Sequence, residues 1–225
     1  MSNSSSMGKC SLCGGTFSRG SMARHLKGCT RPQAPPPSQA AKNRQPGTSF
    51  NVLVAGRYAK DYWMYVAVPV DAPLSKLDHF LRRVWLECCG HLSAFTIGRE
   101  RYASGPMADL GERSMSVRLN RVLDVGLKFS YEYDYGSTTE LTLKVVALRD
   151  QGTPQGGVQL LARNEAPQLP CQRCGARLAT QICTECECRG EGWLCEPCAA
   201  GHECGTEMCL PVVNSPRAGV CGYTG

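Results

Sequence analysis

The sequence lacks several features that identify large classes of protein. It has no apolar run of about eighteen residues, the length that a membrane-spanning helix needs, so we expect no membrane span. Its first residues, Met1–Ser6, carry neither the basic nor the apolar region of a signal peptide, which favours a cytoplasmic location. It also has no P-loop, no HExxH pattern and no nucleophile elbow, so the commonest nucleotide-binding and hydrolase classes find no support.

Acidic residues are absent from the first fifty positions. These positions hold seven bases, whereas the remaining 175 residues carry eighteen bases and nineteen acids, so the formal net charge of +6 comes from the N-terminal arm. Residues 165–225 hold seven acids and four bases, and zinc-bound thiolates would make them still more acidic. We therefore expect a molecule that is basic at its start and acidic at its end.

Cysteine is the residue type present in excess. Thirteen of the fifteen cysteines lie in two clusters, one near each end, and only Cys88 and Cys89 lie between them. A Cys-x2-Cys turn places two thiolates where one tetrahedral zinc ion can bind both, and the chain has four such pairs. In a reducing compartment such cysteines are more often metal ligands than disulfides. The sequence therefore predicts a protein that binds about three zinc ions.

The first cluster, Cys10-x2-Cys13-x11-His25-x3-Cys29, has the ligand spacing of a CCHC zinc finger over residues 1–31. So short a segment holds too little apolar surface to fold alone, so the metal would supply most of the folding energy. The pattern resembles the three-cysteine, one-histidine fingers that bind ubiquitin in eukaryotic repair proteins, and also some nucleic-acid fingers. Four bases on or beside its expected helix could contact phosphate or could form a solvated basic face; they are Arg19, Arg24, Lys27 and Arg31.

The second cluster has three Cys-x2-Cys pairs, which are Cys171 with Cys174, Cys183 with Cys186, and Cys195 with Cys198. Their order resembles a B-box-type cross-brace. That resemblance implies that the first and third pairs hold one zinc ion, while the second pair, His202 and a fourth ligand hold another. Cys204 is favoured over Cys209 as that ligand because it lies nearer to His202. A sequential arrangement, in which the first two pairs share one metal, stays open.

The middle of the chain, residues 49–162, is the only segment long and apolar enough to build a sizeable core. A proline-rich linker over 32–48 precedes it, and residues 163–225 follow as a two-zinc module and tail. Alternating and β-branched residues predict strands, and apolar spacing after Pro73 predicts one helix that ends at Gly90. The strands are expected over 50–55, 62–70, 92–97, 127–133 and 138–148. We expect an α+β fold: an antiparallel sheet with one main covering helix, flanked by two small zinc-binding modules.

One hairpin motif in the middle segment points to a family. Tyr131-Glu132-Tyr133-Asp134-Tyr135-Gly136 resembles the YxYDxG hairpin of the Ri-plasmid ORF-three-like domain family, as do the upstream Leu74-x2-Leu77, Trp85 and His91-Leu92-x2-Phe95-x-Ile97. Members look like passengers of mobile elements and are sometimes labelled resolvase-like. The resemblance covers residues 50–148 and implies no established reaction. The sequence departs from the family pattern after Gly136, where Ser137-Thr138-Thr139-Glu140 stands in place of an acidic residue followed by Trp and His.

Catalysis has weak support in the sequence. His91 and Asp134 could form an acid–base pair, but a histidine after a helix stop and an aspartate in a turn both have ordinary structural roles. The zinc sites are expected to be structural, because four protein ligands leave no position for water. We therefore predict a non-catalytic adaptor with a protein partner. The alternative is a nucleic-acid-binding protein of mobile elements that uses residues 1–48. The apolar tail after Cys209 is expected to pack against a domain or a partner.

Overall fold

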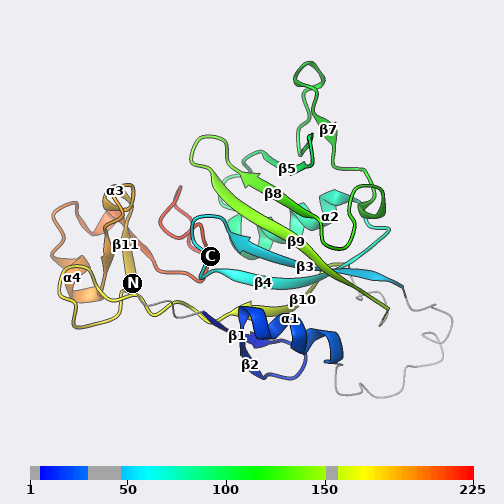
Figure 1. The fold of residues 1–225 in the computed structure, drawn as a ribbon. Coiled ribbons are helices and arrows are strands. Elements are labelled where there is room, and N and C mark those ends of the chain that lie inside the picture. Colours follow the sequence, from blue (N-terminus) through cyan, green and yellow to red (C-terminus); the bar gives the residue numbers. More distant parts are fainter. Residues whose placement is uncertain (1–5, 30–46, 151–156) are drawn as a thin grey trace, which may run out of the picture.

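A computed structural model describes residues 6–29, 47–150 and 157–225. Its main feature is a ten-stranded sheet with the order β2-β1-β10-β4-β3-β9-β8-β5-β6-β7 (Figure 1). The strands are β1 (Met7–Cys10), β2 (Thr16–Ser18), β3 (Ser49–Gly56), β4 (Trp63–Pro69), β5 (Ser93–Ile97), β6 (Glu100–Ala103), β7 (Arg113–Ser114), β8 (Lys128–Tyr133), β9 (Thr139–Arg149) and β10 (Gln159–Asn164).

The predicted fold class is wrong in two respects. The sheet is mixed, because β6 and β7 pair in parallel, and it dominates the molecule where we expected a sheet under one main helix. It is also larger than predicted, since the strands β1 and β2 of the N-terminal finger join it through β10. Residues 30–46, which include Arg31 and most of the expected linker, lie outside the described part of the chain. The division at residues 31, 48 and 162 stays a prediction.

The individual strands of the middle segment are confirmed. β3 and β4 pair antiparallel along their whole length and are almost wholly buried, as expected of β-branched and aromatic runs. β8 and β9 form the predicted hairpin, with residues alternating between a buried and a more exposed face. Asp134 closes it with φ of 65°, and its Oδ1 accepts hydrogen bonds from the backbone N–H groups of Gly136 and Ser137.

The inner face of the sheet is covered by α2 (Leu74–Leu81) and by the π-helical turn η2 (Arg82–Leu86). The predicted helix is therefore shorter than expected and ends before Gly90. Glu87 adopts an extended conformation, and its carboxylate accepts a hydrogen bond from Gly90 N at 2.7 Å. Apolar side chains from these helices fill the main core against β3, β4, β8 and β9; the fully buried ones are Leu74, Leu77, Leu81, Trp85 and Leu86.

The N-terminal finger packs on part of the outer face of the sheet. Met22 and Leu26 of α1 (Arg19–Gly28) form a second core with Trp63 and Tyr65 of β4. Trp63 Nε1 donates to Ser6 Oγ at 2.7 Å, and Tyr65 Oη donates to the carbonyl oxygen of Arg19 at 2.9 Å. The finger is therefore joined to the sheet by strand pairing on one side and by helix packing on the other.

The C-terminal module has its own three-stranded sheet, β12-β11-β13. Its elements are α3 (Thr184–Glu187), β11 (Gln181–Cys183), β12 (Trp193–Leu194), α4 (Glu196–Ala200), η5 (Thr206–Met208) and β13 (Cys209–Pro211). Three-residue 3-10 turns η3 (Ala108–Leu110) and η4 (Leu119–Arg121) lie in the middle segment. Within the described ranges, no helix has the length and apolarity that a membrane crossing requires.

The tail returns from the C-terminal module to the large sheet, as Figure 1 shows in red. Ser215 Oγ donates to the carbonyl oxygen of Trp85 at 2.6 Å, at the end of the helical face. Arg217 is completely buried, and Ala218 and Tyr223 are also buried. The prediction that the tail packs back onto a domain is confirmed.

Candidate metal centres

Four clusters of cysteine and histidine could hold metal ions in the described residues. In each, one candidate ligand atom per residue lies within 4.8 Å of all the others. They are Cys10, Cys13, His25 and Cys29; Cys171, Cys174, Cys195 and Cys198; Cys183, Cys186, His202 and Cys204; and Cys88, Cys89, His91 and Cys221. The first three contain every ligand that the sequence predicted, and the fourth was not predicted.

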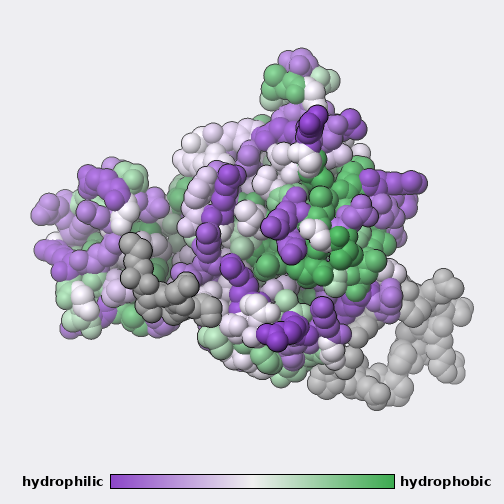
Figure 2. Space-filling view, viewed as in Figure 1, coloured by the Kyte–Doolittle hydropathy of each residue, from purple (hydrophilic) through white to green (hydrophobic). Residues whose placement is uncertain are grey.

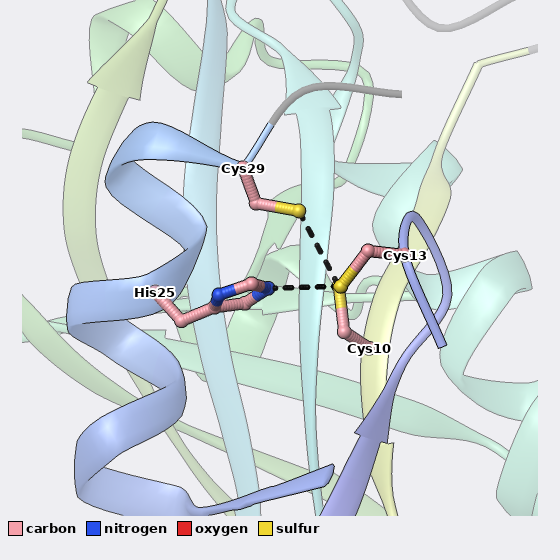
Figure 3. Close-up of side chains that lie close together, drawn as sticks. All are labelled: Cys10, Cys13, His25 and Cys29. Carbon is pink, nitrogen blue, oxygen red and sulfur yellow. Dashed lines mark hydrogen bonds between the residues drawn. The ribbon is translucent and has the colours of Figure 1, made fainter. Parts of the chain in front are cut away.

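The finger site forms between a strand turn and a helix (Figure 3). Cys10 ends β1, Cys13 lies in the turn that follows, α1 supplies His25, and Cys29 caps the end of α1. The Sγ atoms of Cys10 and Cys29 lie 3.9 Å apart, and Cys13 Sγ lies 3.3 Å from His25 Nε2. The ring of Phe17 stacks on the imidazole with a centroid distance of 4.1 Å, which orients Nε2 toward the thiols.

The two C-terminal clusters are interleaved along the chain. The first Cys-x2-Cys pair meets the third, and the second pair meets His202 and Cys204, which is the order that the cross-brace resemblance implies. Cys209 lies outside the cluster, and its Sγ donates to the carbonyl oxygen of Gly205 at 3.8 Å. Metal binding by these residues stays a prediction, but the sequential grouping does not describe this geometry.

The spacing of the sulfur atoms fits zinc. Bonds of about 2.3 Å to a tetrahedral ion would place two sulfur atoms about 3.8 Å apart. The observed Sγ–Sγ distances are 3.9 Å for Cys10 and Cys29, 3.7 Å for Cys174 and Cys195, and 3.8 Å for Cys186 and Cys204. All fifteen cysteines are free, so these contacts are not disulfides. The thiols are therefore positioned to share a central ion.

The electrostatics of the first C-terminal cluster also favour a cation. Burial raises the pKa of Cys171, but backbone N–H groups of Cys174, Cys195 and Arg173 outweigh it and lower the pKa to about 6. The pKa of Cys198 is raised to about 12, first by its hydrogen bond to Cys195 and then by burial. One thiol of the cluster thus ionises easily and another resists a second charge nearby. A divalent ion would remove that resistance, because a thiolate is the form that binds metal.

The fourth cluster joins two distant parts of the chain. Cys88, Cys89 and His91 follow the π-helical turn, whereas Cys221 belongs to the C-terminal tail. The sequence contains a signal for it, the close spacing of Cys88-Cys89-x-His91 together with a surplus cysteine. Spacing alone could not find it, because Cys221 lies 130 residues from His91.

His91 and Asp134 lie close together in the structure, but each also contacts another residue. His91 Nδ1 lies 3.6 Å from Asp134 Oδ1, while His91 Nε2 lies 3.3 Å from Cys221 Sγ. Asp134 Oδ2 pairs with Arg217 at 2.7 Å. Burial raises the pKa of Asp134, but Arg217 and the backbone N–H groups of the turn outweigh it and hold the pKa below its usual value.

The predicted basic residues of the finger separate into two groups. Arg24 and Lys27 are exposed on α1, whereas Arg19 lines a groove of about 680 Å³ between the finger and the outer face of the sheet. Sequence reasoning missed this groove because its other bases come from the sheet and a connecting turn; they are Arg57, Lys60, Lys128 and Lys144. No acidic residue is among the described residues that line it.

Comparison with known proteins gives a family and little more. No curated protein matches the chain. The crystal structure of a protein of unknown function, MM3350 from Methanosarcina mazei Go1, is 14% identical, with a TM-score of 0.43 over 52% of this chain and 67% of that chain. The sequence model described as "Plasmid pRiA4b ORF-3-like protein" matches residues 51–174, which is more than half of the 225 residues. The chain therefore belongs to the family of plasmid pRiA4b ORF-3-like proteins.

Proposed function

We propose that this protein is a non-catalytic interaction protein whose finger and C-terminal module are held by three zinc ions. The observation that carries the proposal is that each of the three predicted clusters supplies four protein ligands. A catalytic zinc site keeps one position open for water or substrate, whereas a four-ligand site is closed. Zinc would therefore build surfaces here and take no part in a reaction.

The C-terminal module supports a structural role for the metal. Four of the six buried residues in its core cluster are cysteines, and the other buried apolar residues of the module are Leu194, Ala199 and Ile182. So little apolar surface stabilises a fold weakly, whereas zinc binding contributes on the order of 10 kcal/mol in small zinc modules. Figure 2 shows mainly hydrophilic residues on the visible face of this module. An acidic, hydrophilic and rigid surface fits a protein partner better than nucleic acid.

Metal analysis of the full chain tests this proposal. We expect at least three tightly held zinc ions per chain, and we expect chelation to unfold the C-terminal module. The variant Cys183→Ala should lose one ion, whereas Cys188→Ala is a matched control, since Cys188 is exposed and belongs to none of the clusters. Fewer than two ions in the wild-type chain would refute the proposal.

A second candidate function, nucleic-acid binding, is favoured by the basic groove. Lys128 of β8 and Lys144 of β9 are directly opposite each other in the sheet register. Like charges opposite each other destabilise a sheet, so the pair costs stability unless an anion lies between them. Arg19 enters the same groove from the finger. Five bases from four segments thus line one surface, beside the hydrophilic residues over β9 and α1 in Figure 2.

The groove favours contact with phosphate and gives no platform for base stacking. Phe129 lines it but is 6% exposed, so its ring belongs to the core. We expect binding to duplex DNA that weakens steeply with salt. The double variant Lys128→Glu/Lys144→Glu should lower the salt slope by about two phosphate contacts. The control is Lys76→Glu/Arg118→Glu, two exposed bases on the side of α2. Equal effects of both variants in fluorescence anisotropy would reject the groove as the binding surface.

A further inference from the structure

The fourth cluster lies where the C-terminal tail crosses the end of the helical face. We propose that Cys88, Cys89, His91 and Cys221 form a fourth zinc site, which fastens the tail to the large sheet. Three thiols and one imidazole are the same ligand set as in the finger, and their ligand atoms meet the same limit of 4.8 Å. The proposal is independent of the three predicted sites, because it uses none of their residues.

The imidazole is oriented as a metal ligand would be. His91 Nε2 lies 3.3 Å from Cys221 Sγ, close to the 3.3 Å and 3.4 Å at which His25 and His202 face their own thiols. Its other nitrogen, Nδ1, faces the carboxylate of Asp134 at 3.6 Å. A carboxylate on the far nitrogen is the usual partner of a zinc-binding histidine, because it fixes the ring and raises its basicity. The edge of the ring also meets Tyr133, with a centroid distance of 5.7 Å.

The backbone is strained at this place. Among the described residues that are not glycine, only Asp134 and Cys221 have positive φ, at 65° and 50°. Asp134 has a local reason, since its side chain accepts the hydrogen bonds of its own turn. Cys221 lies in a turn that the hydrogen bond from Tyr223 N to the carbonyl oxygen of Val220 closes, and a left-handed non-glycine residue in such a turn costs on the order of 1–2 kcal/mol. The strained conformation places its sulfur beside His91, and a bound metal ion would offset that cost.

The positive charge of Arg217 would balance the negative charge of the proposed zinc site. A zinc ion with three thiolates carries a net charge of −1, and Asp134 beside it adds another. Arg217 is completely buried, and its Nη2 lies 3.4 Å from Cys88 Sγ and 2.7 Å from Asp134 Oδ2. A buried guanidinium is stabilised by anionic partners and by hydrogen bonds. The zinc-bound thiolate of Cys88 would add a second anionic partner beside Asp134.

A zinc ion at this site would hold the C-terminal module to the large sheet. The chain leaves the large sheet after Asn164 and returns at Asn214, and these two side chains hydrogen-bond each other at 2.7 Å. The tail then binds the carbonyl oxygen of Trp85 through Ser215 before it reaches Cys221. A metal bond at Cys221 therefore closes the loop that carries the whole module. Cys89 and Cys221 are exposed, so this ion can enter and leave without unfolding the sheet.

Zinc counting in the full chain tests the site. We expect four ions in the wild-type chain, three in Cys221→Ala and three in Cys89→Ala, with both exposed cysteines replaced singly. The control Cys188→Ala should keep four. Unchanged zinc content in Cys221→Ala and Cys89→Ala would overturn the proposal, whatever the other clusters bind. A wild-type chain from reducing lysate with a disulfide at Cys221 would also overturn it.

Two further measurements separate the metal site from ordinary packing. Alkylation of Cys221 should be slow in zinc and become at least tenfold faster after chelation, whereas Cys188 should react quickly in both conditions. Equal rates at Cys221 in both conditions would overturn the proposal. Asp134 is a positioning residue, so its replacement should affect one ion alone. In chelator competition, Asp134→Asn should lower the affinity of the fourth site for zinc about 10–100-fold and leave the affinities of the other three sites unchanged. An equal loss at all sites, or none, would contradict this role.

Discussion

Arg217 gives the sharpest prediction about stability. Its side chain is completely buried and pairs with Asp134 at 2.7 Å, and Asp134 is itself 5% exposed. Its Nη1 also donates to the carbonyl oxygen of Ser137 at 3.1 Å and to Thr139 Oγ1 at 3.0 Å. The substitution Arg217→Met keeps the apolar stem but leaves a buried carboxylate without its counter-ion. Removal of one partner from such a pair costs about 3–5 kcal/mol.

We expect the lower end of that range, because Asp134 keeps its hydrogen bonds from Gly136 N and Ser137 N. A cost of about 3 kcal/mol corresponds to a fall in melting temperature of about 6–12 °C for a chain of this size. Urea denaturation in zinc-replete buffer, followed by tryptophan fluorescence, measures the change in the free energy of unfolding. Trp85, whose carbonyl oxygen is bound by the tail, is a reporter close to the substitution.

Two control variants distinguish the buried pair from other effects. Arg113 forms an ion pair with Glu100 at 2.6 Å, but both side chains are exposed, so Arg113→Met should cost less than about 1 kcal/mol. The double variant Arg217→Met/Asp134→Asn removes the buried carboxylate together with its counter-ion, and we expect it to be more stable than Arg217→Met alone. A cost for Arg217→Met no greater than for Arg113→Met would refute the reasoning, as would a double variant that loses the sum of both single changes.

Three other predictions follow from packing and metal content. In Gly8→Ala the new Cβ would overlap the Trp63 ring, so we expect the free energy of unfolding to fall by about 1–3 kcal/mol and the finger to be proteolysed faster. Gly20→Ala, with open space around the new Cβ, should show neither effect. Asp78→Ala should cost about 1–3 kcal/mol in urea denaturation, because Tyr131 Oη donates to the buried Asp78 at 2.8 Å; a neutral result would show that water replaces the carboxylate. Chelation should raise hydrogen exchange in the β11–β13 sheet before it affects β3 and β9, and simultaneous loss would contradict separate stabilisation of the module by zinc.

The strands of the middle segment could be predicted because their signals are local. In β8, Phe129, Tyr131 and Tyr133 alternate with more exposed residues, and the turn at Asp134 follows directly. The order of the strands is not local. β10 lies between β1 and β4, so it joins the finger to the sheet, and no periodicity within residues 159–164 indicates either neighbour. The predicted sheet was too small for this reason.

The helix shows how a side chain can override apolar spacing. Apolar residues continue at helical intervals from Leu74 to Cys88, so the pattern predicts a helix up to Gly90. The structure ends the helical face at Leu86, because the carboxylate of Glu87 binds Gly90 N, Tyr133 Oη and Arg82. Tyr133 comes from another strand, Arg82 from the previous turn and Gly90 from the segment that follows. The resulting bend releases Cys88 and Cys89 from the helix toward the tail.

The clusters separate in the same way into local and non-local sites. The finger ligands span residues 10–29 and the C-terminal ligands span 171–204, so spacing located both sets, whereas the grouping of the C-terminal set into two sites came from the cross-brace resemblance. Cys221 can meet His91 only because β10 pairs with β4 and the chain returns beside it at Asn214. The position of the fourth cluster therefore depends on the strand order that the sequence does not reveal. The strand order should therefore be known before a surplus cysteine in such a chain is taken as inert. Among the described residues, Cys188 and Cys209 are the two cysteines that belong to no cluster.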